Sequence, residues 1–208
     1  MKIQRVLEVF RWQSPFIRIA AFLVFLGGAF GYYFADELAS RLQPILLELE
    51  SLANQLQGAG ALAMFRVIFL NNLLAAVTML FMGILFAFFP MYALLVNGMA
   101  IGYLMWGVEA SNQNPALLLL LGILPHGIFE IPAILLAGGF GIHWGFQALR
   151  SIWRSMQPSA EKGGFLRSFQ PFFRQLPLTL ASIFVLLLIA AIIESTLTPY
   201  LLSQFYLR

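Results

Sequence analysis

The chain has 208 residues, of which 61% are hydrophobic and only 10% carry a charge, with a formal net charge of +3. A soluble domain of this length needs far more polar surface, so the composition predicts a membrane protein that crosses the bilayer several times. The small net charge argues against nucleic-acid binding. The absence of cysteine excludes disulfides, thiolate metal sites and cysteine nucleophiles.

The first apolar stretch covers residues 16–34 and is long enough for the roughly 20 helical residues that cross a bilayer. It follows the basic side chains Lys2, Arg5 and Arg11. Since positive residues stay on the cytoplasmic side, we expect residues 1–15 to be cytoplasmic. The stretch is longer than the apolar core of a signal peptide, which predicts a retained span.

Segment 35–63 is more polar and does not read as a span. From Leu38 to Leu56 its apolar residues recur at alternating steps of four and three, which is typical of an amphipathic helix. We expect an external helix here. It either lies on the membrane or on the protein's own spans, or it forms a coiled-coil contact between subunits.

Four more apolar stretches follow. Residues 64–89 and 91–108 are predicted as a hairpin of two spans, 116–147 as a net single crossing, and 177–199 as the last span. Segment 150–175 holds five basic residues and is predicted as a cytoplasmic loop. Together these segments predict one all-α membrane domain over residues 1–208, a polytopic helical bundle with about five crossings and a cytoplasmic N-terminus.

Residues 124–133 read Leu-Pro-His-Gly-Ile-Phe-Glu-Ile-Pro-Ala. The four-residue spacing places His126 and Glu130 on one face of a helix. Pro125 and Pro132 each remove a backbone donor that a helix would use. The element therefore predicts that the fourth crossing is a broken helix.

Six polar side chains occur inside four predicted spans. An amide or carboxylate that faces lipid is unfavourable, so we expect them to form a buried cluster. They are Asn71, Asn72, Asn97, His126, Glu130 and Glu194.

Three interpretations of this cluster stay open. It makes hydrogen bonds that fix helix packing, it lines a polar path or small-solute site, or His126, Glu130 and Glu194 form a metal or hydrolytic centre. No catalytic motif and no cofactor are predicted. His143 is expected at the cytoplasmic interface.

Three Gly-x-x-x-Gly steps permit close approach of helices: Gly27 with Gly31, Gly98 with Gly102, and Gly141 with Gly145. They serve packing within one subunit or a homodimer contact.

Four elements together resemble the stage II sporulation protein M family: the Asn71-Asn72 pair, the run from Asn97 to Tyr103, residues 124–133, and the run from Glu194 to Pro199. The resemblance implies an all-helical protein of the bacterial cytoplasmic membrane. For the sporulation member it implies a scaffold in engulfment, which recruits partners that remodel peptidoglycan.

Our interpretation is a membrane scaffold in cell-envelope remodelling, homodimeric and not an enzyme, with the bilayer and peptidoglycan-remodelling enzymes as partners. One alternative is a transporter or channel-like protein with a polar path past Asn71, Asn97, His126 and Glu130. Another is an intramembrane metal-dependent hydrolase.

Overall fold

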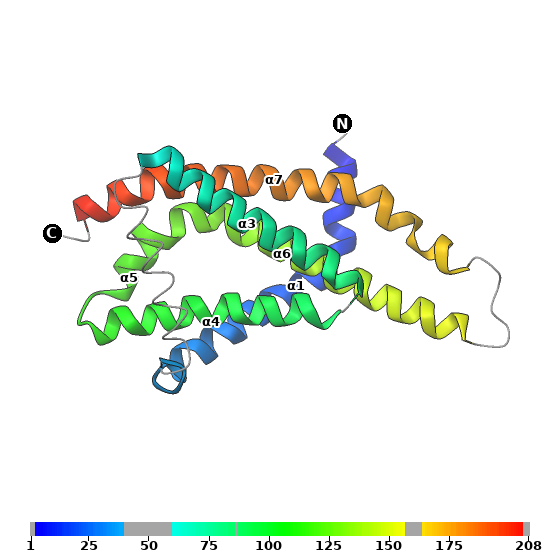
Figure 1. Ribbon diagram of the computed structural model, residues 1–208, viewed down its shortest axis with the longest axis horizontal. Helices are drawn as coiled ribbons and strands as arrows, with labels where there is room; N and C mark the ends of the chain where they lie inside the picture. The colour runs from blue at the N-terminus through cyan, green and yellow to red at the C-terminus, as the bar shows by residue number, and fades with distance from the viewer. Residues whose placement is uncertain (1–2, 40–59, 86, 157–163, 206–208) are drawn as a thin grey trace.

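A computed structural model describes residues 3–39, 60–85, 87–156 and 164–205, and every regular element within these ranges is helical. Figure 1 shows long helices that run side by side between two ends of the molecule. The elements are α1 (Ile3–Tyr33), α3 (Gly60–Leu85), α4 (Phe88–Ala110), α5 (Pro115–Leu118), the π-helix η1 (Leu119–Ile123), α6 (Leu124–Ser155) and α7 (Gly164–Phe205). The all-α prediction is confirmed.

Five segments among the described residues are long and apolar enough to cross a membrane: Gln13–Tyr33, Gly60–Gly83, Phe88–Ala110, Pro115–Ser155 and Arg167–Gln204. Their number agrees with the five predicted crossings. Successive spans run in opposite directions, so the N-terminal part of α1 and the α6–α7 connection lie toward one end while the C-terminus lies at the other (Figure 1).

The predicted loop over 150–175 is wrong for most of its length, since α6 continues to Ser155 and α7 begins at Gly164. Apolar residues recur at helical spacing between the arginines, and this amphipathic pattern favours helix over loop. Residues 1–15 likewise belong mostly to α1, which contains Pro15. Of the predicted external segment 35–63, residues 40–59 lie outside the described ranges. Residues 35–39 are helical and 60–63 open α3.

Helix α6 is the centre of the bundle and packs against α1, α3, α4 and α7. Its face from Ala133 to Trp144 is buried almost continuously. One core cluster joins α6 to α3 and α7 around Leu80, Phe140 and Ile183. A second joins it to α1, α3 and α4 around Leu94. Helix α6 therefore contacts all four other long helices, while α1 also packs directly on α4 and α3 on α7.

The Gly-x-x-x-Gly steps all serve contacts within the chain. A Cβ at Gly31 would lie 2.7 Å from Cα of Met99, and one at Gly98 would lie 2.9 Å from the backbone nitrogen of Gly28. Helices α1 and α4 thus touch backbone to backbone. A Cβ at Gly141 would lie 3.4 Å from the carbonyl carbon of Met79 on α3. The glycines place α1 against α4 and α3 against α6, which is the first of the two predicted uses.

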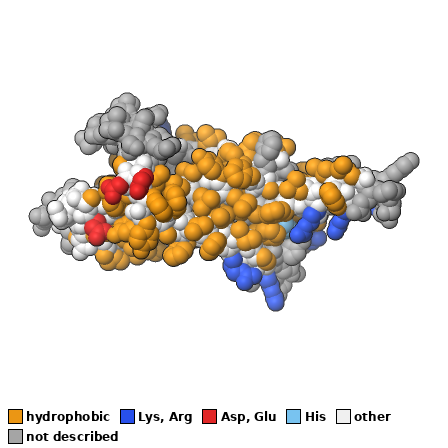
Figure 2. All heavy atoms as spheres, turned by 90° about the horizontal axis from the view of Figure 1, so that it is seen from below, with side chains coloured by type: hydrophobic (Ala, Val, Ile, Leu, Met, Phe, Trp, Pro, Cys, Tyr) orange, Lys and Arg blue, Asp and Glu red, His pale blue; other side chains and the backbone are white. Residues whose placement is uncertain are grey.

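The two ends of the bundle differ in charge. Three acidic residues lie at one end: Asp36 and Glu37 follow α1, and Glu109 is near the end of α4. Figure 2 shows the acidic side chains at this end and the arginines toward the other. The basic end carries exposed arginines from α1, α6 and α7: Arg11, Arg18, Arg150, Arg154, Arg167 and Arg174. Arg66, near the start of α3, is an exception among the described arginines. This polarity follows the charge bias of a membrane protein.

Candidate functional site

The helix interruption predicted at residues 124–133 lies slightly earlier, in η1. The backbone N–H of Leu124 donates to the carbonyl of Leu119, five residues back. Pro125 follows at once, and its ring would clash with the carbonyl four residues before it in a regular α-helix. The wide π turn relieves this conflict, and α-helix resumes at Leu124 and continues through Pro132. Such single π turns are frequent beside functional sites.

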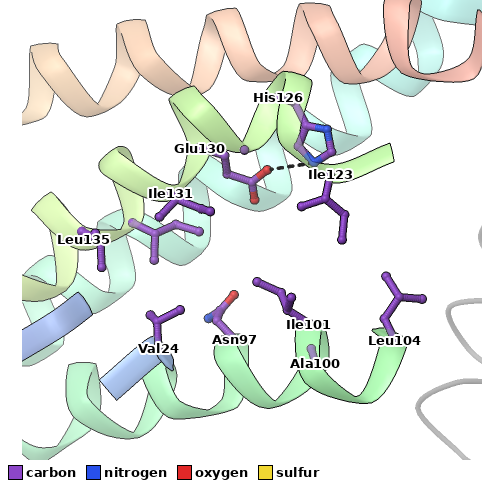
Figure 3. A pocket seen from close by; sticks show the side chains of 12 residues that line it. Val24, Asn97, Ala100, Ile101, Leu104, Ile123, His126, Glu130, Ile131 and Leu135 are labelled. Carbon is purple, nitrogen blue, oxygen red and sulfur yellow. Dashed lines mark ion pairs between the residues drawn. The ribbon is translucent and has the colours of Figure 1, made fainter. Parts of the chain in front are cut away.

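A cavity of about 240 Å³ lies beside this turn, between α4 and α6, with one residue from α1 (Figure 3). This volume holds several waters or a small solute. Its walls are mostly apolar, and three polar side chains interrupt them. The lining residues are Val24, Asn97, Ala100, Ile101, Leu104, Ile123, His126, Gly127, Glu130, Ile131, Ile134 and Leu135.

His126 and Glu130 lie on the same face of α6, as their spacing predicts. Nε2 of His126 is 3.8 Å from Oε2 of Glu130, which is the distance of a loose ion pair rather than a hydrogen bond. Both side chains are largely buried, with 13% and 20% of their surface exposed. Nδ1 of His126 is buried and has no hydrogen-bond partner among the described residues.

Glu194 on α7 completes a group of three potential metal ligands. One ligand atom from each of His126, Glu130 and Glu194 lies within 4.8 Å of the other two. One turn beyond Glu194, Thr198 is 7% exposed, and its hydroxyl has no hydrogen-bond partner among the residues that the structure describes. Residues four apart share a helix face, so Thr198 lies on the same side of α7 as Glu194.

Asn97 faces this group from α4. Its Nδ2 donates to the carbonyl of Ala93 at 2.8 Å, and in Figure 3 its oxygen points toward Glu130. Asn97 therefore presents an acceptor to the cavity. The structure brings together His126, Glu130 and Glu194, three of the six residues that we predicted to form a buried cluster. Asn97 lines the same cavity but is exposed, so it is not buried as predicted.

The two asparagines of α3 do not belong to the cluster, which corrects the prediction. Asn71 is exposed, Asn72 is half-buried, and neither lines the cavity. Phe69, Leu73 and Ala76 form the face of α3 that packs on the core. Asn71 lies two residues from both Phe69 and Leu73, and the helical rotation points it away from α6.

A second polar group joins three helices near the basic end. Gln13 on α1 donates from Nε2 to Oε1 of Gln175 on α7 at 3.0 Å, and its own Oε1 lies 3.0 Å from Nδ1 of His143 on α6. His143 also stacks on Phe16, with ring centroids 4.3 Å apart. Gln13 is only 1% exposed. His143 was predicted as a plain interfacial residue, whereas it is half-buried and bonded to Gln13.

Sequence reasoning missed Gln13, Gln175 and Thr198. Gln13 and Gln175 lie in segments predicted as cytoplasmic, and Thr198 lies near the end of the last predicted span. A weak signal for Thr198 existed, because it follows Glu194 at the four-residue spacing that joins His126 and Glu130.

Five helices that are long and apolar enough to cross a membrane define a polytopic helical membrane protein. Comparison with known proteins places it more closely: the stage II sporulation protein M family matches residues 20–199, and the chain belongs to this family. An uncharacterized protein of Methanocaldococcus jannaschii is 34% identical over 136 residues, which cover 65% of this chain and 71% of that protein. No solved structure matches the chain.

Proposed function

We propose that the chain acts as a membrane scaffold in cell-envelope remodelling rather than as an enzyme. Membership of the stage II sporulation protein M family supports this role. The proposal places the chain in the bacterial cytoplasmic membrane with its N-terminus in the cytoplasm, because the basic end would then be cytoplasmic. Its partners are membrane-anchored enzymes that remodel peptidoglycan.

The observation that carries the proposal is a helical arm at the basic end, formed by residues 149–155 of α6 and 167–175 of α7. The span Pro115–Ser155 has 41 residues, or about 60 Å of helix, against a hydrocarbon core of about 30 Å. Helix α7 has 42 residues, whereas α4 has 23. The long pair extends past the other helices at this end (Figure 1), so it can reach partners outside the bilayer core.

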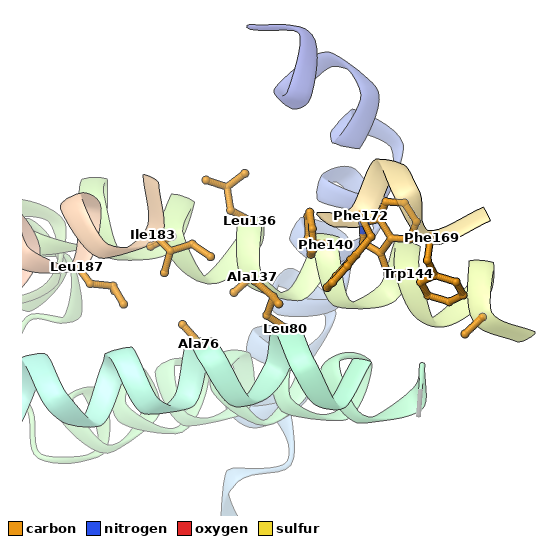
Figure 4. Packing of buried hydrophobic residues seen from close by; sticks show 12 residues of the cluster. Ala76, Leu80, Leu136, Ala137, Phe140, Trp144, Phe169, Phe172, Ile183 and Leu187 are labelled. Carbon is orange, nitrogen blue, oxygen red and sulfur yellow. The ribbon is translucent and has the colours of Figure 1, made fainter. Parts of the chain in front are cut away.

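The arm is held rigidly at its base. Trp144 and Phe140 of α6 pack against Phe169 and Phe172 of α7, as Figure 4 shows. Farther out, the hydroxyls of Ser151 and Ser168 lie 2.7 Å apart. A rigid pair of helices loses little conformational freedom when a partner binds, which favours a docking role.

The surface of the arm is amphipathic. Leu149, Ile152, Trp153 and Phe173 are exposed, and exposed arginines lie between them. Large exposed aromatic residues with arginine are the side chains that contribute most to protein interfaces.

The test is affinity purification of the full chain from its native membrane, with identification of co-purifying proteins. Peptidoglycan-remodelling enzymes are expected with the wild type and lost with the double variant Trp153→Ser/Phe173→Ser. Tyr200→Ser, which removes an exposed aromatic at the opposite end, is the matched control and should retain them. Absence of such enzymes from the wild-type preparation refutes the proposal.

The cavity favours a second candidate, a transporter or channel-like path past Asn97, His126 and Glu130. Since the chain has no cysteine, a single introduced cysteine can report whether water reaches its position. Ala100→Cys lines the cavity, and Ala75→Cys is an exposed control on α3 outside it. Rapid reaction of the first alone with a small hydrophilic thiol reagent supports a water-filled path. Equally slow reaction of both contradicts it.

We also propose that the scaffold is a homodimer. The apolar heptad positions of 35–63 lie largely outside the described ranges, and the Gly-x-x-x-Gly steps are used within the chain. A subunit contact would therefore depend on the amphipathic helix predicted within 35–63 and on apolar outer faces of the spans.

A further inference from the structure

The intramembrane trio combines two carboxylates and an imidazole from two helices. Glu130 and His126 come from α6, Glu194 from α7, and their ligand atoms all lie within 4.8 Å of one another. The side chains are half-buried or better between packed helices rather than on an exposed acidic surface. Carboxylates that stay ionised in a shared dry site need a compensating positive charge, and otherwise they take up protons.

The described residues that line the cavity beside the trio do not supply that charge. The cavity lining contains no lysine or arginine, and His126 is its only basic side chain. One protonated histidine would balance one carboxylate and leave the other uncompensated. A divalent cation with a neutral histidine balances both carboxylates and makes the site neutral overall, which is the least costly state in a low-dielectric interior.

The ligand types narrow the choice of ion. Magnesium and calcium prefer oxygen ligands alone, whereas imidazole with carboxylates suits zinc, manganese or iron. Ligand atoms around such an ion lie roughly 3–4 Å apart, since each bond is about 2.0–2.2 Å. The separation of 3.8 Å between His126 and Glu130 already falls in this range. Small rotations of the two flexible glutamates bring the rest of the group within it.

Thr198 supplies a further buried polar atom beside the trio. Its hydroxyl has no hydrogen-bond partner among the described residues and lies on the face of α7 that carries Glu194. An unpaired buried hydroxyl costs free energy, and a water bound to the ion would satisfy it. The cavity next to the trio has room for such waters, and Asn97 presents its oxygen to it.

We propose that His126, Glu130 and Glu194 bind one divalent transition-metal ion inside the membrane, with water in the remaining coordination positions that face the cavity. This assignment is independent of the scaffold proposal, because it concerns the opposite half of α6 from the arm. Loss of partner binding and loss of metal binding are separate measurements on separate variants.

The experiment uses the purified full chain in detergent, stripped with a chelator and then exposed to Zn²⁺. Metal content after gel filtration is measured by mass spectrometry, and affinity by competition with a chromophoric chelator. We expect about one zinc per chain and a weakening of at least about tenfold in Glu130→Gln, Glu194→Gln and His126→Gln. Asp36→Asn removes an exposed carboxylate outside the trio and should bind as the wild type does.

A spectroscopic readout separates ligation from damage to the fold. Co²⁺ bound in place of zinc should give visible absorption bands that change shape in His126→Gln, because a nitrogen ligand is lost. Each glutamine variant retains size and hydrogen-bonding capacity, and gel filtration confirms that it remains folded. A wild-type chain that elutes without metal, or three variants that retain its affinity, would overturn the assignment.

Discussion

Replacement of Gly98 by alanine tests the backbone contact between α1 and α4 most directly. The added Cβ would lie 2.9 Å from both the backbone nitrogen of Gly28 and the carbonyl carbon of Val24. These are backbone atoms inside a helix, so no side-chain rotation can relieve the overlap. The two helices must move apart, and overpacking of this kind costs about 1–3 kcal/mol.

Gly107→Ala is the matched control on the same helix. Nothing lies within 4 Å of the position of its Cβ, and alanine favours helix over glycine by about 1 kcal/mol. Gly98→Ala gains the same helix preference, so the two variants should differ by the overpacking cost alone, about 1–3 kcal/mol. Gly28→Ala should behave like Gly107→Ala, because its Cβ would meet only the carbonyl oxygen of Gly98 at an ordinary 3.7 Å.

The assay is the apparent melting temperature of the purified protein in detergent, followed by circular dichroism. Gly98→Ala should melt roughly 2–12 °C below Gly107→Ala, and Gly28→Ala should melt close to Gly107→Ala. Equal melting temperatures for Gly98→Ala and Gly107→Ala would refute the backbone contact and return the glycines of α4 to the lipid or to a partner subunit.

Three further predictions concern topology, the second polar group and self-association. Ser155→Cys at the basic end should resist an impermeant thiol reagent in intact cells while Ser111→Cys reacts, and the reverse pattern would invert the orientation. Gln13→Leu removes a hydrogen-bond partner from both His143 and Gln175, so it should destabilise the protein by about 1–3 kcal/mol per unpaired group. Gln170→Leu, on the exposed face of α7, is the control and should leave the melting temperature unchanged. Leu42→Lys/Leu49→Lys should abolish crosslinked dimers in membranes if the 35–63 helix joins subunits. Unchanged dimers would leave it on the membrane or on the spans.

The number of crossings and the all-α fold could be predicted because the bilayer imposes both. Each span needs about 20 apolar residues and internal backbone hydrogen bonds, so hydropathy alone locates the spans. The same criterion failed for the arm. It assigned residues 150–175 to a loop because they are charged, whereas amphipathic helices carry charges outside the hydrocarbon core.

The direction in which a polar residue of a span points could not be predicted from the sequence. Asn71 and Asn72 were expected in the buried cluster, but the rotation of α3 depends on which face packs against α6 and α7. The contact of Phe69 and Leu73 with the core turned Asn71 outward. His126 and Glu130 were placed correctly relative to each other because both lie on one helix, where spacing alone fixes the shared face.

Contacts between distant segments could not be predicted from spacing. Gln13 and Gln175 are separated by 162 positions, and nothing local to either indicates the other. The Gly-x-x-x-Gly steps gave the capacity for close approach but not the partner. Gly27 and Gly31 could equally have met a second subunit, and only the packing of α4 against α1 shows that they do not.

The walls of the cavity differ in their freedom to move, and this difference follows from the glycines at which α1 and α4 touch. Val24 on α1 and Asn97 on α4 belong to two helices in backbone contact, so that wall shifts only as a unit. The opposite wall is the beginning of α6, where a π turn and Pro125 already depart from regular helix geometry. A guest that required more than side-chain rotation of His126 and Glu130 would therefore displace the start of α6 rather than the α1–α4 pair. Since α6 continues as one helix to Ser155, its N-terminal half forms the cavity and its C-terminal end forms the arm.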